Sequence, residues 1–391
     1  MKRKFVKKIY IDPETVDYPL TQQIIASVSS DILEFIPASK LLLEKSGNIS
    51  LGQGKKIILV SKFEGDFLKP CPGTSRDYLC CQYHILNPVM GCPLNCSYCI
   101  LQAYLNNPFL RVYANLEDMF NQVSDYLGHF PGRLFRIGTG ELTDSLALES
   151  LVPLSQWLIE YFADRKDVIF EFKTKTDDID HLLDLEPPPN LVVSWSLNPQ
   201  KIIQKEEGGT VSLERRIRAA QRVQRKGYKV GFHFDPLLIF PGWEEEYRRL
   251  LDMLFSRVST QGIIWISLGS LRFPPSLKEI IQKRFPSSRL IYEEMIRGLD
   301  GKMRYLRPTR LHLYKKIINQ IKQVDDKVFC YLCMESADVW RRSMGFSPQS
   351  NAHLDFLFAQ SIEKRFQDIQ LSLPDLSHYS LIHSSFFLKN K

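Results

Sequence analysis

The sequence predicts an α/β fold, an open partial barrel of parallel strands with an extension at each end. Six short runs rich in β-branched and apolar residues recur along the middle of the chain, and helix-like segments lie between most of them. Alternation of buried strands with helices is typical of a parallel sheet. Six strand–helix units are fewer than the eight that close a barrel, so a partial barrel is expected.

The expected strands are residues 83–88, 134–138, 168–174, 191–197, 229–234 and 262–268. Helices are expected over residues 116–128, 145–163 and 212–226. The last begins at Ser212, a good N-cap, and stops at Gly227. Functional side chains should lie at the carboxyl edge of such a sheet, where strands end and loops begin.

The 391-residue chain divides by pattern into four parts. These are an N-terminal extension (1–80), a barrel core (81–270), a basic C-terminal region (271–358) and a tail without firm periodicity (359–391). No apolar run is long enough to span a membrane, and the basic N-terminus lacks the apolar stretch of a secretory signal. A cytoplasmic protein is therefore expected. In that compartment eight cysteines indicate metal ligands or catalytic groups rather than disulfides.

Positive charge is concentrated near the C-terminus. Net charge is +7, whereas residues 271–322 alone hold 13 Lys or Arg against 4 Asp or Glu, an excess of 13 − 4 = +9. Such a localised excess favours a polyanionic partner, most commonly nucleic acid. Solvated amphipathic helices would give the same pattern. The candidates for backbone contacts are Arg289, Arg297, Lys302, Arg304, Arg307 and Arg310.

Three cysteines are packed into one loop. Cys92, Cys96 and Cys99 have the spacing C-x3-C-x2-C and follow the first expected strand. Three thiolates can bind three irons of a [4Fe–4S] cluster and leave the fourth iron open to another ligand. Zinc would need a fourth ligand close by, and His84 is the only nearby candidate. After the second strand, Gly140 allows close backbone approach and Glu141 offers a carboxylate.

The cysteine motif followed by partial-barrel strands resembles the radical S-adenosylmethionine (SAM) superfamily, in which the open iron binds the amino and carboxylate groups of that cofactor. Tyr98 matches an aromatic residue common there, and Gly140-Glu141 resembles the turn that holds the cofactor's amino group. Within the superfamily, the segments KKIYIDPETVDYPL, CSYCILQ, FKTK, SWSLNP and GFHFDP resemble the spore photoproduct lyase family.

The resemblance implies a partial (β/α)6 TIM-like barrel and repair of UV-damaged thymine lesions in DNA through a 5′-deoxyadenosyl radical. Damaged DNA and an electron donor such as a flavodoxin or ferredoxin are the implied partners. It also implies contacts of Lys173 or Lys175 and of Ser196 with the cofactor. Asn198, His233 and Asp235 would line the floor of the pocket.

The sequence departs from the type enzyme of that family at two places. A hydrogen-donating cysteine follows the second strand there, whereas this chain has Glu141 or Leu142. The tyrosine after the third cluster cysteine is replaced by Ile100. Hence we expect either that hydrogen comes from elsewhere, with Tyr98 the nearest candidate donor, or that the enzyme catalyses a different radical outcome. Glu141 would then serve the cofactor. A radical enzyme acting on RNA or a small metabolite, and a non-enzymatic, metal-stabilised nucleic-acid-binding protein, are the alternatives.

Five cysteines lie outside the motif, namely Cys71, Cys80, Cys81, Cys330 and Cys333. They could converge on a second, four-thiolate site that holds zinc or an auxiliary cluster. Cysteine is also one of the residues most often buried in a core, so simple packing is the alternative.

Overall fold

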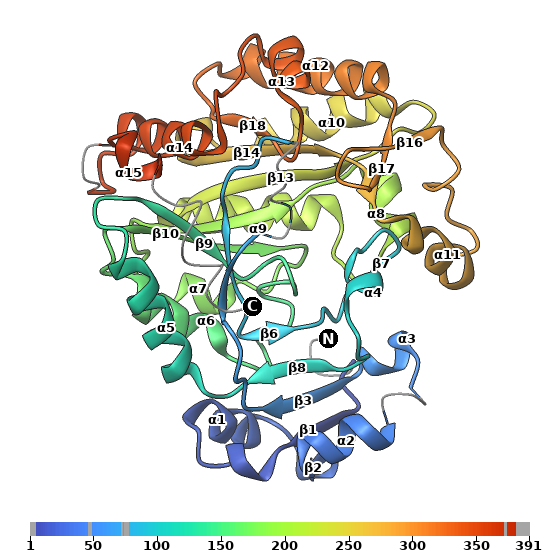
Figure 1. Cartoon of the computed structure of the whole chain (residues 1–391), viewed down its shortest axis with the longest axis vertical. Coiled ribbons are helices and arrows are strands. Elements are labelled where there is room, and N and C mark those ends of the chain that lie inside the picture. Colours follow the sequence, from blue (N-terminus) through green and yellow to red (C-terminus); the bar gives the residue numbers. More distant parts are fainter. Residues whose placement is uncertain (1–4, 46–48, 72, 74–77, 371–373, 381–391) are drawn as a thin grey trace.

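The computed structural model describes residues 5–45, 49–71, 73, 78–370 and 374–380. Its two largest sheets lie one above the other in Figure 1, and the larger is curled into an open half-barrel. The cysteine loop, with β7 (Asn95–Cys96) and α4 (Leu101–Tyr104), lies between them. None of the helices in the described part of the chain combines the length and apolar character that a membrane span requires.

The larger sheet has eight strands in the order β18-β14-β13-β11-β10-β9-β5-β4. Neighbouring strands are parallel, except that β4 runs antiparallel to β5. The strands are β4 (Leu68–Pro70), β5 (His84–Leu86), β9 (Phe135–Gly138), β10 (Val168–Thr174), β11 (Leu191–Ser196), β13 (Lys229–Leu237), β14 (Ile263–Ser270) and β18 (Cys330–Leu332). The six predicted runs form the six consecutive strands from β5 to β14. The partial barrel is therefore confirmed, and β4 and β18 extend it at its two edges.

Helices pack against this sheet because each has an apolar face. Besides α4, those between β5 and β14 are α5 (Leu116–Gly128), α6 (Leu154–Phe162), α7 (Asp180–Leu183), α8 (Gln200–Glu206), α9 (Leu213–Lys226) and α10 (Trp243–Phe255). The hydroxyl of Ser212 accepts a hydrogen bond from the Arg215 amide, and Gly227 ends α9 with a φ of +119°. The helices predicted over 116–128 and 212–226 are confirmed.

The helix predicted over residues 145–163 is correct only in its last part, because α6 begins at Leu154. The Asp144 carboxylate accepts hydrogen bonds from the amides of Leu146 and Ala147, which holds the chain in a turn. Pro153 stands directly before the helix and lacks the amide hydrogen that a continuous helix would use. The apolar residues before it are buried as a loop.

The smaller sheet contains five strands in the order β2-β1-β3-β8-β6, with only β6 antiparallel to its neighbour. The strands are β1 (Lys8–Ile11), β2 (Leu33–Phe35), β3 (Ile57–Ser61), β6 (Val89–Met90) and β8 (Leu110–Tyr113). Its helices are α1 (Pro19–Ser27), α2 (Ala38–Lys45) and α3 (Leu51–Gly54). Since β6 and β8 come from beyond residue 80, this sheet draws on both the predicted N-terminal extension and the predicted core.

The C-terminal region adds helices and a small antiparallel sheet ordered β15-β17-β16. Its elements are α11 (Pro275–Arg284), α12 (Arg307–Val324), α13 (Ala337–Met344), α14 (Asn351–Arg365), α15 (Ser377–Ser380), β15 (Arg272–Phe273), β16 (Met295–Arg297) and β17 (Met303–Tyr305). Helix α14 crosses the predicted start of the tail at residue 359 and buries Ala359 and Ile362. Residues 371–373 and 381–391 of that tail lie outside the described residues.

Candidate active site

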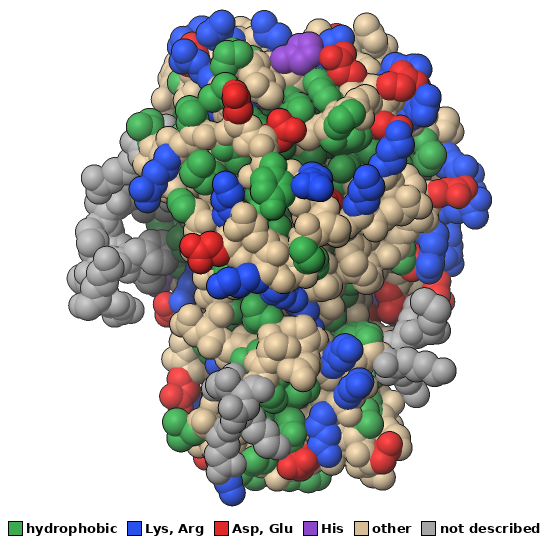
Figure 2. Space-filling model, turned by 90° about the vertical axis from the view of Figure 1, so that its right-hand side faces the viewer, with side chains coloured by type: hydrophobic (Ala, Val, Ile, Leu, Met, Phe, Trp, Pro, Cys, Tyr) green, Lys and Arg blue, Asp and Glu red, His purple; other side chains and the backbone are tan. Residues whose placement is uncertain are grey.

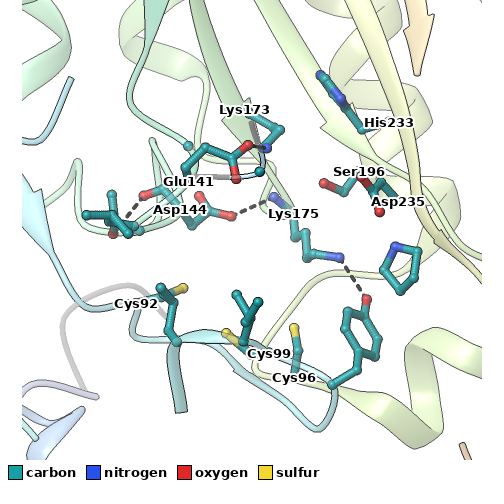
Figure 3. A pocket seen from close by; sticks show the side chains of 18 of the residues that line it. Cys92, Cys96, Cys99, Glu141, Asp144, Lys173, Lys175, Ser196, His233 and Asp235 are labelled. Carbon is teal, nitrogen blue, oxygen red and sulfur yellow. Dashed lines mark hydrogen bonds and ion pairs between the residues drawn. The ribbon is translucent and has the colours of Figure 1, made fainter. Parts of the chain in front are cut away.

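A cavity of about 280 Å³ opens at the carboxyl edge of the half-barrel. Figure 3 shows its walls, with the cysteine loop on one side and the ends of the strands on the other. The predicted residues that line it are Cys92, Cys96, Cys99, Tyr98, Gly140, Glu141, Lys173, Lys175, Ser196, His233 and Asp235. The sheet thus brings together side chains that are far apart in the sequence.

The cysteine loop is fixed from outside the pocket. The Lys55 ammonium donates hydrogen bonds to the carbonyl oxygens of Cys92 (2.8 Å) and Leu94. Strand β7 pairs with β12 (Glu207–Gly208), so that Cys96 lies opposite Glu207. Burial raises the pKa of the Cys92 thiol to about 12 in the absence of any metal. A bound cation would therefore be needed to keep the Cys92 thiol deprotonated at neutral pH.

Tyr98 is held by a buried carboxylate. Its hydroxyl donates to Glu207, and the Lys175 ammonium donates to both the Tyr98 hydroxyl (2.9 Å) and Glu207 (3.1 Å). Arg216 forms a second ion pair with Glu207 at 2.6 Å. Burial alone would raise the pKa of Glu207, but Lys175 and Arg216 hold it well below its usual value. A donor role for Tyr98 stays a prediction that this arrangement does not favour.

The turn after β9 packs closely against β10. A Cβ atom at Gly140 would lie 2.5 Å from the Cβ of Lys173, so only glycine fits there without a shift. The Lys173 ammonium forms an ion pair with Glu141, and both side chains line the pocket. Burial favours neutral Lys173, but the Glu141 carboxylate outweighs it and raises the pKa of the ammonium. Lys173 is thus the charged partner of the predicted Gly140-Glu141 turn.

Like Glu207, two further buried carboxylates were not anticipated from the sequence. Asp144 accepts hydrogen bonds from the Thr174 hydroxyl and the Lys175 amide (each 2.7 Å), which joins the turn after β9 to the end of β10. Glu171 accepts hydrogen bonds from Tyr83 (2.7 Å) and from Trp265 (3.0 Å), and also binds Ser194 and His233. An acidic residue inside an apolar strand, as in VIFEFKT, is the signal that could have revealed Glu171.

His233 contacts Glu171 at 2.8 Å while it lines the pocket. Burial alone would raise the pKa of Glu171, but His233, Ser194 and Lys173 together lower it to about 2. Glu171 is therefore a carboxylate at neutral pH and fixes the orientation of the imidazole. Ser194 binds Glu171 and Ser196 lines the pocket, and the two side chains point to the same face of β11 because they lie two residues apart on one strand.

Asp235 forms the far wall of the pocket with a buried arginine. Arg272 donates to its two carboxylate oxygens at 3.1 and 3.0 Å, and to the sulfur of Cys333 at 3.1 Å. Burial would raise the pKa of Asp235, but Arg272 lowers it, so this side chain is anionic. Asn198 does not line the cavity and instead donates to Glu207 at 3.0 Å, behind Tyr98.

Of the remaining cysteines, only Cys330 lies apart, because Cys71, Cys81 and Cys333 influence one another electrostatically and Cys80 forms a hydrogen bond with Cys81. Cys330 has Lys322, Arg365 and Asp325 as its charged neighbours, whereas Cys333 has Arg272 and Asp235 and lines the pocket. Within the described residues, no three His, Cys, Asp or Glu side chains are arranged to hold a single metal ion. None of the eight cysteines forms a disulfide. The second metal site predicted from Cys71, Cys80, Cys81, Cys330 and Cys333 stays a prediction.

Comparison with known proteins gives consistent results. A family model described as spore photoproduct lyase matches residues 80–330. Curated spore photoproduct lyases from Bacillus subtilis and from a Geobacillus species are each 28% identical to this chain, with 75% of it and 86% of each relative covered. The enzyme from Clostridium acetobutylicum is 25% identical, with 74% of this chain and 86% of the relative covered.

The fold agrees with solved structures. A spore photoproduct lyase complexed with dinucleoside spore photoproduct superposes with a TM-score of 0.74 at 24% identity. The superposition covers 84% of this chain and 98% of the chain of that lyase. A mutant of spore photoproduct lyase with bound AdoMet and dinucleoside spore photoproduct gives a TM-score of 0.73, also at 24% identity and with the same coverage.

The half-barrel and its cysteine-lined pocket, taken with these matches, define a lyase of the radical SAM type. The family match covers more than half of the residues. The chain belongs to the spore photoproduct lyase family. The predicted family, fold class and enzyme class are confirmed.

Proposed function

We propose that this protein repairs UV-induced thymine lesions in DNA as a radical SAM lyase. The observation that carries the proposal is the single pocket in which three loop thiols face the Gly140-Glu141 turn and the ends of β10, β11 and β13. The family match and the relatives named spore photoproduct lyase support the same conclusion.

Cys92, Cys96 and Cys99 would hold a [4Fe–4S] cluster. The fit rests on their chemistry and placement, because all three thiols line one wall and Lys55 fixes the loop from behind. A cubane takes each thiolate on a different iron, so the three sulfurs need not converge on one point. When bound, the cluster supplies the electron that cleaves SAM to a 5′-deoxyadenosyl radical.

The surrounding residues would position the cofactor. Glu141 offers a carboxylate to its amino group, and Lys173 and Lys175 offer cations beside the same space. Ser196 offers a hydroxyl from the end of β11. Asn198 would act indirectly, since it binds Glu207 and Tyr98 behind the pocket wall.

The lesion would occupy the side of the pocket formed by His233, Asp235, Arg272 and Lys302. A base must leave the stack to reach such a pocket, and a crosslinked thymine pair stacks weakly. DNA is therefore the proposed partner.

For two of the six residues predicted to contact the DNA backbone, the prediction is wrong. Arg304 is 1% exposed and forms an ion pair with Asp300, and Arg310 is buried against Glu335. Arg289, Arg297 and Arg307 are exposed and remain candidates for contacts with the backbone. Figure 2 shows one face of the molecule, on which Lys and Arg side chains are spread among Asp and Glu side chains rather than collected in one patch.

A small redox protein such as a flavodoxin or ferredoxin would supply the reducing electron.

The decisive experiment for the whole proposal is product analysis. Anaerobically reconstituted protein is incubated with SAM, a reductant and dinucleoside spore photoproduct, and the products are separated by mass. We expect loss of the lesion and recovery of thymine. Cleavage of SAM without any consumption of the lesion would contradict the proposed substrate and leave the radical chemistry intact.

A further inference from the structure

Two thiols outside the cysteine loop face the same pocket. Cys71 follows β4 and Cys333 follows β18, the two edge strands of the half-barrel. The Cys71 amide donates to the Tyr83 carbonyl and the Cys333 amide to the Leu268 carbonyl, each at 2.8 Å. The curl of the sheet thus brings both of its edges to the cavity, and the backbone holds each thiol in place.

Both thiols keep their hydrogen at neutral pH. Burial raises the pKa of Cys71 and of Cys333 far above the usual value of a thiol, and the Glu141 carboxylate raises both further. A protonated thiol at the wall of the pocket is a good hydrogen-atom donor, because an S–H bond is weaker than the C–H bond that a carbon radical forms.

Of the two thiols, Cys71 is better placed to give up its hydrogen. The Cys333 sulfur accepts a hydrogen bond from Arg272 and its thiol contacts Asp235. The largest charged influence on Cys71 is Glu141, in the turn after β9 where this chain lacks a cysteine. Tyr98 is a weaker candidate, because its hydroxyl hydrogen is donated to Glu207.

We propose that Cys71 is the hydrogen-atom donor that quenches the product radical in this enzyme. The inference rests on the proposed function and deepens it. In the transfer one C–H bond forms on the product and one S–H bond breaks, which leaves a thiyl radical on Cys71. No external oxidant or reductant is consumed. The hydrogen atom taken from the substrate in the first step stays on 5′-deoxyadenosine as a C–H bond. Its return to the thiyl radical would restore the S–H bond and regenerate the 5′-deoxyadenosyl radical. Re-formation of SAM from that radical and methionine, with return of the electron to the cluster, would draw this uphill transfer forward.

The test is a single turnover in heavy water with unmodified protein and with Cys71→Ser. A thiol exchanges its hydrogen with solvent, so the unmodified enzyme should place one solvent deuterium in the repaired product. Serine preserves size and polarity, but its O–H bond is too strong to yield a hydrogen atom. Deuterium in the correct product should fall at least about tenfold, or ~1.4 kcal/mol in barrier, while SAM cleavage and consumption of the lesion continue.

Cys330→Ser is the matched control, because this thiol lies on β18 outside the pocket, and it should retain deuterium transfer. Cys333→Ser tests the other pocket thiol as the donor. Unchanged transfer in Cys71→Ser, or its loss only in Cys333→Ser, would overturn the inference. Absence of lesion consumption in the unmodified protein would instead refute the proposed function.

A second readout does not depend on the loaded enzyme. Dinucleoside spore photoproduct should slow the alkylation of Cys71 by a small maleimide, as measured by peptide mass spectrometry, and should leave Cys330 unaffected. Equal rates at Cys71 with and without the dinucleoside would place this thiol away from the lesion and would also overturn the inference.

Discussion

The site depends on buried carboxylates that organise their neighbours. Glu207 links Tyr98, Lys175 and Arg216, and Glu171 links four side chains from four strands or strand ends. Spacing in the sequence indicated the cysteine loop and the Gly140-Glu141 turn, and the family resemblance implied Lys173, Lys175, Ser196, His233 and Asp235. The sequence did not reveal these carboxylates, because their partners are brought together only by the sheet.

Removal of Glu207 should therefore damage the fold as well as the site. Glu207→Ala leaves Arg216, which is fully buried, without its carboxylate, and breaking such a pair typically costs about 3–5 kcal/mol. Urea unfolding of the protein without cluster measures the loss. Glu245→Ala is the control, since its ion pairs with Arg248 and Arg249 are exposed and should contribute at most about 1 kcal/mol. Equal losses in the two variants would show that Glu207 is not a structural hub.

Glu149 gives the folded protein a predictable dependence on pH. Burial raises its pKa from 4.5 to about 7, although hydrogen bonds from Ser155 oppose this. Between these values the folded state retains a proton that the unfolded state has lost, so stability falls as pH rises through this range. A shift from 4.5 to about 7 corresponds to about 3 kcal/mol.

Glu149→Gln should remove this part of the pH dependence. The free energy of unfolding of the variant, relative to that of the unmodified protein, should therefore rise from pH 5 to pH 8. Chemical unfolding at several pH values measures the difference. The neighbouring Asp178 and His181 are present in both proteins, so the difference reports Glu149. Parallel pH profiles for the two proteins would exclude a raised pKa at Glu149.

At the scale of elements, the sequence predicted what periodicity and end signals encode. The six central strands and helices α5 and α9 agree with it because each is a long apolar or amphipathic run with clear ends. Strand β18 has only three residues, too few for a clear pattern, and the sequence drew attention there only through Cys330 and Cys333. Residues 145–153 look helical but form a turn, because Asp144 binds backbone amides there. Such competition from a side chain leaves no trace in a hydrophobic pattern.

The cysteine loop should behave as one unit. Cys92→Ala, Cys96→Ala and Cys99→Ala are each expected to abolish both the bound iron and sulfide and the reductive cleavage of SAM, since each thiolate would hold a separate iron. Cys330→Ala is the control, because that thiol lies in β18 away from the pocket. Iron and sulfide analysis after anaerobic reconstitution is the measurement. Full iron content in any of the three loop variants would refute the cluster assignment.

At the scale of the whole molecule, the fold decides how much of the positive charge is free to bind DNA. The positive excess of residues 271–322 was visible in the sequence, but the number of cations free to bind DNA was not. Arg272, Arg304 and Arg310 are neutralised by Asp235, Asp300 and Glu335 inside the protein. The positive charges that remain at the surface include Arg289 and Arg297. Arg297 lies on β16, which pairs with β17, and Lys302 of the pocket wall directly precedes β17.

DNA binding should consequently weaken with salt, and the exposed arginines should determine how steeply. Each phosphate contact contributes about −0.9 to the slope of log affinity against log salt on duplex DNA. Replacing both residues, Arg289→Glu and Arg297→Glu, should therefore reduce the magnitude of the slope by up to about 2. Fluorescence anisotropy with a labelled duplex at several salt concentrations measures it. Arg222→Glu on α9 is the matched control, because it is exposed but outside the basic segment. If both proteins lose slope equally, or neither does, the basic segment is not the DNA-binding surface, and its surplus charge serves only to keep the helices solvated.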